Sequence, residues 1–580
     1  RQMCIRDSER GRSRNVTIAD DVEYGPSRHL DEELRSDSDS MDSRVLHAKE
    51  IGVSTTYDRQ IVMLNKAIKE EIGFGKFQLK VTLLAGCGWL ADNIWFEILT
   101  MTLPRIKDEF KLQDSDNKYA TLSLYSGLLI GSTFWGLCSD IIGRRPSWNM
   151  SLFLSAAFGI AVGGAYDLKS ICILLGCLGL GLGGNLPVDG AMLIEYIPGS
   201  HQWILTFLSL FWCIGQLFAA LIGWAFIATY HCADSDNCPK SENWGWRYAW
   251  FLLGGVVMLM FVARFFIYPI PESPKFLLAT GREDKAYEVL QFIAKENGKT
   301  TSLTLEQLRS IKHGRTERLD AANSELRQEP NTESKEKFDE ATMEVRDPKT
   351  IKNAWLTAMT SESYCTPKNI RQTFRCMHRS PFSALFASPK MAINTTIICL
   401  LWGMIGLAYP LFNSYISIYI NQVDPVGTSL PEQYRQLVEI AACGIPGSFF
   451  AAAMAELPYM GRKGCMALFT VLTGIFLFLF TTAGNASAVL GWNCAVSLTQ
   501  NAMYAVLYAI TYEVFPAPQR GTGDGLSMSV QRIFGVVATV VAKFGPENFK
   551  PPVYVSGSLY LVASVLMLLL PYEPRGKSAL

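Results

Sequence analysis

A short joint between two long apolar stretches carries the residues with the most evident chemistry. The sequence GLCSDIIGRRPSW at 136–148 places the carboxylate of Asp140 near the guanidinium groups of Arg144 and Arg145, with Gly136 and Gly143 among them. Glycines allow helices to approach closely, and a carboxylate can pair with a nearby guanidinium group. We therefore expect a charge-paired latch at this joint.

A second joint repeats this pattern. AELPYMGRKG at 455–464 resembles the first joint, and EVFP at 513–516 resembles EYIP at 195–198. Both pairs are separated by 318 positions, from Gly143 to Gly461 and from Glu195 to Glu513, which predicts a parallel internal repeat. The second joint and the rest of the charge network comprise Glu456, Arg462, Lys463, Glu195, Glu513 and Arg520. The alternative is a plain set of interfacial charges that follow the positive-inside rule.

Other polar residues interrupt the apolar stretches themselves, where a charge is costly and rarely idle. Asp92 and Glu97 are candidates for binding a coupling proton, because burial raises the pKa of a carboxylate towards neutrality. Arg532 offers a planar fork that suits a carboxylate. The further candidates for the solute or proton pathway are Asn185, Asp189, Asn413, Tyr508 and Tyr512. The alternative is that Asp92 or Asp189 pairs with Arg532 and only holds the helices together.

The elements that position these residues are twelve apolar stretches long enough to span a bilayer. Six precede a long polar stretch and six follow it, so we expect an all-α membrane protein of twelve transmembrane helices in two six-helix pseudo-repeats. The expected boundaries are 77–268 and 391–571 for the two halves and 269–390 for a cytoplasmic central loop. Residues 1–76 are expected to be a disordered tail, and 572–580 a short one. Gln2–Asp7 match the peptide encoded by a common sequencing adapter and carry no argument.

Composition excludes several classes of function. The chain has 53 basic and 53 acidic residues, whereas a nucleic-acid-binding protein shows a basic excess. The fourteen cysteines form no CxxC or Cys/His cluster, so neither a metal site nor a cofactor is expected. Cys232 and Cys238 lie in a polar loop and can form a disulfide if that loop is outside the cell. No hydrolase, kinase or dinucleotide motif is present, so the chain is not expected to be an enzyme.

Lys and Arg in the short loops set the expected orientation. Arg144, Arg145, Arg462, Lys463 and Arg520 fall on one side, which is expected to be cytoplasmic together with both termini. The plasma membrane is the expected location, and one chain is expected to be the working unit.

The motifs resemble those of one known family. GLCSDIIGRR matches the major facilitator signature, Gly-x3-Asp-x2-Gly-Arg-Arg/Lys, and PESPKFLL at 271–278 is similar to the sugar-porter motif. Other stretches, such as GLGGNLPVDGAMLIEYIP, look more like the synaptic-vesicle-glycoprotein-like and organic-acid/niacin-like branch, and uncharacterised fungal members look closest. The Gln-Gln pair that binds hexose in true sugar porters is absent from LLWGMIGLAYPLFNSY at 400–415. His201 and Gln202 stand where many relatives have Arg-Gly, which weakens one half of the latch.

The resemblance implies a secondary transporter that works by alternating access, with the charged joints as its cytoplasmic gate. We expect proton-coupled transport of a small polar organic solute, with a carboxylate favoured by Arg532 and a sugar or polyol next. The alternatives are a nutrient sensor on the same fold that does not transport, and an exporter of drugs or toxins. The expected partners are therefore the solute, protons and the lipid bilayer.

Overall fold

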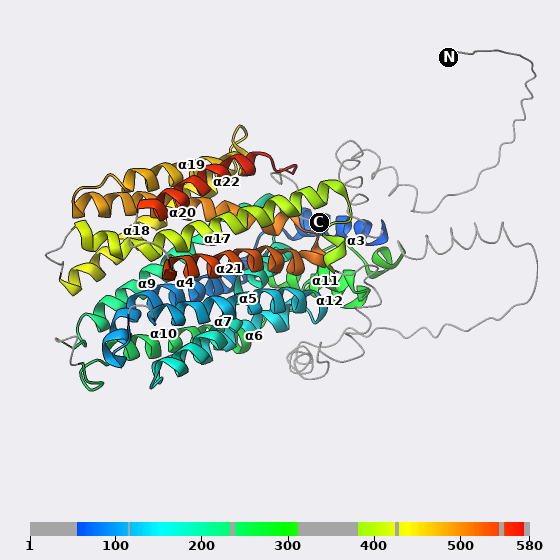
Figure 1. Cartoon of the computed structure of the whole chain (residues 1–580). Coiled ribbons are helices and arrows are strands. Elements are labelled where there is room, and N and C mark those ends of the chain that lie inside the picture. The colour runs from blue at the N-terminus through cyan, green and yellow to red at the C-terminus, as the bar shows by residue number, and fades with distance from the viewer. Residues whose placement is uncertain are drawn as a thin grey trace, which may run out of the picture.

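The computed structural model describes residues 55–113, 116–232, 238–310, 381–423, 429–544 and 550–572. All regular structure in these ranges is helical, and twelve long helices run side by side (Figure 1). Eight of them are long and apolar enough to cross a membrane by length and composition alone. The predicted all-α class with twelve helices is confirmed.

The first six long helices form one group. They are α4 (Lys76–Phe110), α5 (Asn117–Ile141), α6 (Arg144–Gly163), α7 (Leu168–Tyr196), α9 (Ser209–Ile227) and α10 (Gly245–Val262). The short helices η2 (Gly199–His201) and α8 (Trp203–Phe207) precede α9, and η3 (Ala263–Ile267) extends α10. Within this group α7 packs against α5 and α6, and α4 packs against α9.

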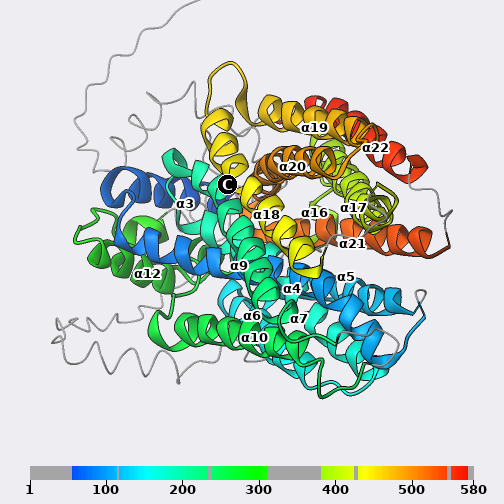
Figure 2. The same ribbon diagram turned by 90° about the vertical axis from the view of Figure 1, so that its left-hand side faces the viewer.

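The last six long helices form a second group. They are α17 (Pro389–Val423), α18 (Leu430–Ala455), α19 (Gly461–Phe480), α20 (Ala486–Val514), α21 (Arg520–Phe544) and α22 (Lys550–Leu568), with α16 (Pro381–Ala384) and η4 (Ala517–Gln519) as short additions. The two groups lie beside one another in a view along the bundle (Figure 2). They meet chiefly where α5 packs against α21 and where α9 packs against α18.

The internal repeat is visible in the backbone. Gly143, directly before α6, has φ 112°, and Gly461, the first residue of α19, has φ 59°; both values lie in the region that residues with side chains rarely adopt. Each glycine follows a helix of its own group and redirects the chain into the next one. The two joints that share a sequence pattern therefore also share a turn whose backbone conformation favours glycine.

Small helices cover one end of the bundle. They are α3 (Thr55–Lys66), η1 (Ala67–Ile72), α11 (Pro274–Ala279) and α12 (Glu283–Glu296), on the right in Figure 1. We call this end, which also carries Gly143, Ser200 and Tyr459, the signature end. The expectation that residues 1–76 are disordered is wrong for 55–72, because these residues form helix. Ile61, Leu64, Ile68 and Ile72 recur at helical spacing and are all buried.

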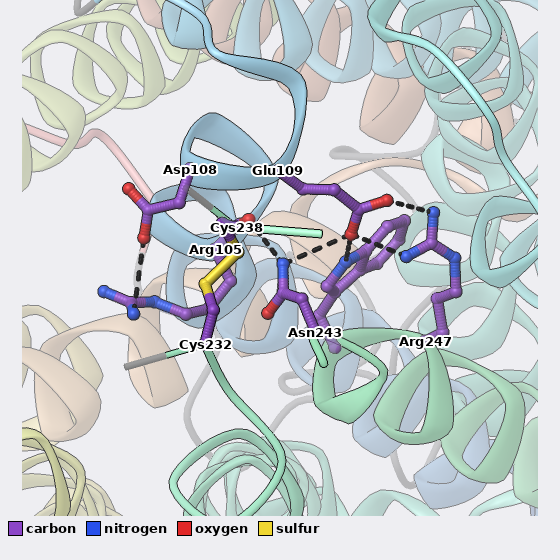
Figure 3. The surroundings of a disulfide bond; sticks show 8 residues. Arg105, Asp108, Glu109, Cys232, Cys238, Asn243 and Arg247 are labelled. Atoms are coloured by element: carbon purple, nitrogen blue, oxygen red, sulfur yellow. Dashed lines mark hydrogen bonds and ion pairs between the residues drawn. A yellow bond between two sulfur atoms is a disulfide. The ribbon is translucent and has the colours of Figure 1, made fainter. Parts of the chain in front are cut away.

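The opposite end, which we call the disulfide end, carries a bond between Cys232 and Cys238, whose Cα atoms are 5.4 Å apart. Close to it, Glu109 at the end of α4 accepts two hydrogen bonds from Arg247 of α10, both 2.7 Å long (Figure 3). Asn243 and Trp246 donate to the same carboxylate. This cluster ties α4 to α10 within the first group.

Close helix contacts depend on glycine at a few positions. A Cβ atom on Gly183 of α7 would lie 2.5 Å from the carbonyl oxygen of Leu128 and 2.6 Å from the amide nitrogen of Ser132, both in α5. Backbone atoms on both sides cannot move aside cheaply, so this helix pair excludes any side chain here. By contrast, nothing lies within 4 Å of the position that a Cβ on Gly255 would take.

We expect Gly183→Ala to destabilise the protein by roughly 1–3 kcal/mol through overpacking. The measurement is thermal unfolding in detergent, with Gly255→Ala as the matched control that leaves the midpoint unchanged or slightly raised. Equal unfolding midpoints for the two variants would contradict the proposed tightness of the α5–α7 contact.

Candidate functional site

One contact between the two groups places a carboxylate of one group at the helix start of the other. Asp140 at the end of α5 accepts hydrogen bonds from the backbone amides of Gly521 (3.2 Å) and Thr522 (2.7 Å). The hydroxyl of Thr522 donates a third, 2.7 Å long. The first amides of a helix have no partner inside it and carry partial positive charge. Asp140 therefore caps α21 across the interface.

Glycines make this cap possible. A Cβ atom on Gly136 would lie 2.7 Å from the carbonyl oxygen of Gly521 and 2.8 Å from the Cα of Gly525. The backbones of α5 and α21 are thus in direct contact one turn away from the cap. This contact brings the Asp140 carboxylate within reach of the amides at the start of α21.

Two buried arginines extend the cap into a network. Arg144 lies 3.0 Å from Asp140 and 3.1 Å from Glu195 of α7, and it also donates to the carbonyl of Ala517 beyond the interface. Arg520 of α21 lies 3.4 Å from Glu195 and donates to the carbonyl of Tyr512. Glu195 therefore stands between an arginine of each group. All these charged side chains are fully buried.

The second joint forms a related but smaller cluster. Arg462 pairs with Glu513 and lies 3.4 Å from Glu456, so the pairs Arg144–Glu195 and Arg462–Glu513 repeat at the spacing of 318 positions. Lys463 instead donates to the carbonyl of Leu570. The positions that would repeat Asp140 and Arg520 hold Pro458 and Gln202. The cap at α21 consequently has no counterpart at the start of α8.

Two residues of the network were missed by the sequence analysis, although both belong to the quoted motif PESPKFLL. Glu272 accepts hydrogen bonds from the backbone amides of Arg144 (3.0 Å) and Arg145 (3.2 Å), and burial raises the pKa of Glu272 against the pull of Arg144. Lys275 is almost fully buried, and this burial, aided by repulsion from Arg520, lowers the pKa of Lys275 to about 7. The side chain of Arg145 is only half-buried.

The first group contains a further buried ion pair. Asp189 of α7 lies 3.1 Å from Arg264 of η3 and accepts a hydrogen bond from the indole of Trp148. Arg264 also lies over the Trp148 ring and donates to the carbonyls of Leu84 and Trp148. Sequence analysis missed Arg264, because a basic residue at the end of an apolar stretch is expected there anyway. The expected alternative partner of Asp189 was Arg532, and Asp189 pairs with Arg264 instead.

Two more carboxylates lie between α4 and its neighbours. Asn185 of α7 donates a 2.9 Å hydrogen bond to Asp92, which is almost fully buried. Gln216 of α9 donates a 3.2 Å hydrogen bond to the half-buried Glu97. In the described ranges neither carboxylate forms an ion pair. Each has a side-chain amide group as its partner, and an amide group can hydrogen-bond to both the ionised and the protonated form of a carboxyl group.

Aromatic rings from both groups meet at the centre of the molecule. The Tyr508 ring of α20 lies 4.8 Å from Trp89 of α4, 5.4 Å from Trp212 of α9 and 4.6 Å from Trp402 of α17, measured between ring centroids. Tyr504 stacks on Trp212 at 5.8 Å. We call these five residues the aromatic cluster. It is the place where helices of both groups present flat apolar surfaces to one another.

Several buried polar atoms in this central region have no hydrogen-bond partner among the described residues. They are Trp89 Nε1, Trp95 Nε1, Asn185 Oδ1, Tyr508 OH, Gln531 Oε1 and Arg532 Nε. The guanidinium group of Arg532 lies over the Phe96 ring at 5.4 Å and interacts electrostatically with Asp92 and Tyr508. Within the described chain it makes no ion pair. Buried polar groups normally have partners, so these atoms offer unused donors and acceptors to a bound molecule.

The remaining predicted pathway residues lie around this centre. The ring of Tyr512 occupies the space that a side chain on Gly190 would fill, and its hydroxyl donates to the carbonyl of Leu186. Tyr512 thus joins α20 to α7 on the signature side of the aromatic cluster. Asn413 is exposed and hydrogen-bonds the side chain of Tyr409.

In the part of the chain that the structure describes, no group of three His, Cys, Asp or Glu residues could hold a metal ion.

Known proteins resemble this chain over most of its length. The family model described as sugar (and other) transporter matches residues 99–338. The MFS siderochrome iron transporter 1 of Ceriporiopsis subvermispora is 40% identical over 90% of this chain and 92% of its own. The major facilitator-type transporter hxnZ of Emericella nidulans is 33% identical over 88% of this chain and 86% of its own.

A solved structure supports the fold. The proton:xylose symporter XylE from E. coli superposes with a TM-score of 0.61 at 16% identity, covering 87% of this chain and 98% of that one.

The cap at α21 predicts an effect on access to the interface. Asp140→Asn removes the charge of three charge-assisted hydrogen bonds, each worth about 1.5–3 kcal/mol. We expect a cysteine introduced at the buried Ser139 to react at least about tenfold faster with a water-soluble thiol reagent in this variant. The assay uses a background without reactive cysteines, with the exposed Asp284→Asn as the control. An unchanged rate would show that the cap does not hold this interface closed.

Lys275 predicts a pH dependence of stability. Its pKa falls from 10.5 in water to about 7 in the folded protein, so between these values the unfolded chain binds more protons and stability rises with pH. Arginine stays protonated throughout. We expect the stability of the parent protein relative to Lys275→Arg to increase from about pH 7 to about pH 9, by up to ~1.4 kcal/mol per pH unit. Parallel melting curves across this range would refute it.

Proposed function

The chain belongs to the major facilitator superfamily of membrane transporters, and on that premise we propose that it moves a small organic carboxylate together with protons by alternating access. It is a multi-pass integral membrane protein that carries a small solute. The relatives and the fold are those of transporters rather than enzymes. The nature of the solute and the coupling ion are the proposal.

The buried position of Arg532 is the main support for this proposal. The residue as a whole is 7% exposed, its Nε has no hydrogen-bond partner in the described chain, and the helix that holds it lines the contact between the two groups. A buried cation without a bound anion is costly, and a guanidinium fork matches the two oxygens of a carboxylate. A carboxylate solute would complete the charge pair that the protein leaves open.

The aromatic cluster supports a solute that also carries a flat ring. Tyr508 has ring neighbours on three other helices, and neither its hydroxyl nor the indole nitrogen of Trp89 has a hydrogen-bond partner among the described residues. A planar ring bound among these side chains would keep stacked and edge-to-face contacts on several sides. The free donors would then fix its orientation.

Asp92 is the proposed coupling residue. It lies in the same electrostatic neighbourhood as Arg532 but has Asn185 as its hydrogen-bond partner. An ionised Asp92 would compete with a solute carboxylate for Arg532. Protonation of Asp92 removes that competition, so binding of a proton and binding of an anion would favour one another.

The gate network is the proposed means of alternation. We propose that the halves 77–268 and 391–571 rock about the central site, with 269–390 as the connecting loop. The cap of Asp140 on α21 and the Tyr512 contact close the signature end. By the positive-inside rule this end faces the cytoplasm with both termini, and the plasma membrane is the proposed location. A single chain suffices for this cycle.

Two other solutes deserve direct tests. The relative of 40% identity is named for siderochrome iron, which makes a ferric siderochrome the second candidate. A sugar is the third, because the matching family model is described as sugar (and other) transporter.

We predict proton-driven uptake of a small aromatic carboxylate. The protein is reconstituted in liposomes with an acidic outside, and uptake of radiolabelled nicotinate, xylose and ferrichrome is measured separately. Nicotinate should accumulate, and Arg532→Gln should reduce its uptake about 10- to 100-fold, since a charge-assisted bond is worth about 1.5–3 kcal/mol. The exposed Arg435→Gln is the matched control and should behave like the parent protein.

The alternatives have distinct signatures. Uptake of xylose or ferrichrome that persists in Arg532→Gln would overturn the carboxylate assignment and leave Arg532 a structural role. Tight binding of nicotinate without any uptake would favour a nutrient sensor that does not transport its solute.

A further inference from the structure

At the contact between α5 and α21, the structure buries a carboxylate that accepts no hydrogen bond from any described residue. Asp524 lies one turn into α21, between Gly521 and Gly525, the two glycines that contact Gly136. It is fully buried, and neither Oδ1 nor Oδ2 has a hydrogen-bond partner among the described residues. Asp140, a short distance away in the same interface, accepts three hydrogen bonds. In the same interface, the Asp140 carboxylate therefore has hydrogen-bond donors, whereas the Asp524 carboxylate has none among the described residues.

The charges around Asp524 come from every element packed against the start of α21. Its own helix contributes Arg520, and the facing helices contribute Asp140 of α5, Arg144 of α6, Glu195 of α7 and Tyr512 of α20. Further from Asp524, Lys275 of α11 interacts with Arg520, and Tyr57 of α3 interacts with both Arg520 and Arg144. Glu272, which precedes α11, interacts with Arg144, and Cys399 of α17 interacts with Ser527. The two arginines are the nearest positive charges.

Both arginines are already engaged. Arg144 bonds to Asp140, Glu195 and two backbone carbonyls, and Arg520 bonds to Glu195 and to the carbonyl of Tyr512. An ionised Asp524 would thus be an additional negative charge in a buried cluster, without hydrogen bonds to stabilise it. Such a charge is far more costly than a neutral carboxylic acid.

We propose that Asp524 binds a proton when the signature ends of the two halves close and releases it when they part. The proton comes from the aqueous solution at the signature end and returns to it, and the carboxylate ionises once water reaches it. This inference rests on the proposed rocking of the halves but not on the identity of the solute. Asp524 is therefore a second proton-binding site, separate from Asp92, that links proton concentration to the position of the gate.

The proposal fixes the direction of the pH effect. Because closing takes up a proton, acidification must increase the closed fraction, by up to about tenfold in the closed-to-open ratio per pH unit. Lys275 acts in the opposite direction and only above about pH 7, where it loses its proton in the folded protein. A rise of the closed fraction on acidification below about pH 7 therefore reports a carboxylate.

The test measures the gate directly. Ser200 and Tyr459, both exposed at the signature end, are changed to cysteine in a background without reactive cysteines and carry spin labels. Distance distributions are recorded in lipid nanodiscs from about pH 4.5 to about pH 7.5 without solute. The short-distance fraction of the parent protein should grow as the pH falls. Asp524→Asn should show a high and pH-independent short-distance fraction, and the smaller neutral variant Asp524→Ser should also lose the pH dependence.

Two further variants separate this proposal from the others. Thr522→Val removes the hydrogen bond that the Thr522 hydroxyl donates to Asp140 without removing a titrating group, so it should lower the closed fraction and keep the pH dependence. Arg532→Gln, which tests the solute anchor, should keep it too. A parent protein whose distances do not respond to pH, or Asp524 variants with the parent's pH response, would overturn the proposal.

Discussion

The start of helix α21 must find partners for its first amides, and it finds them in the other half of the protein. The Asp140 carboxylate supplies those partners at 2.7–3.2 Å and is itself held by Arg144 at 3.0 Å. Several other residues at the signature end are needed for Asp140 to reach these amides. Glycine is needed at 136, 521 and 525 so that the backbones can meet, and Glu195 is needed to hold Arg144 and Arg520 side by side. A cap made across the interface between the halves stabilises only the arrangement in which these helix ends are in contact, which is what the proposed gate requires.

The internal repeat explains why similar ion pairs occur in both halves, and the positions that do not repeat explain why the cap by Asp140 has no equivalent at the second joint. The pairs Arg144–Glu195 and Arg462–Glu513 occupy repeated positions, so each half braces its own joint. Among the described residues, one half adds a carboxylate that caps a helix of the other half, whereas Pro458 stands where the repeat would place a second Asp140. The proposed gate therefore has one such cap at the signature end, and the disulfide end carries contacts such as the 3.0 Å hydrogen bond from Tyr434 to the carbonyl of Met101. Opening one cap is energetically easier than breaking two.

The sequence was most informative where a pattern recurs at fixed spacing. Two motif pairs 318 positions apart predicted the repeat, and the charged motifs themselves predicted a network of Asp140, Arg144, Glu195 and Arg520. Twelve apolar stretches predicted the helices because lipid leaves the backbone no other solution. Arg264 and Asp524 were not predicted, since their significance lies in what surrounds them after folding. The helix at 55–66 was missed because the polar composition of the whole tail outweighed the buried stripe that begins at Ile61.

We infer that Asp140 protects the first amides of α21 from exchange with solvent when the signature end is closed. Hydrogen exchange of the peptide spanning 520–526, measured by mass spectrometry in nanodiscs, tests it directly. Asp140→Ala should make this peptide exchange much faster, while peptides from the middle of α7, which packs within its own half, should be unchanged. Exchange in 520–526 that is equally slow with and without the Asp140 carboxylate would contradict the account, because the start of α21 would then be held by something else.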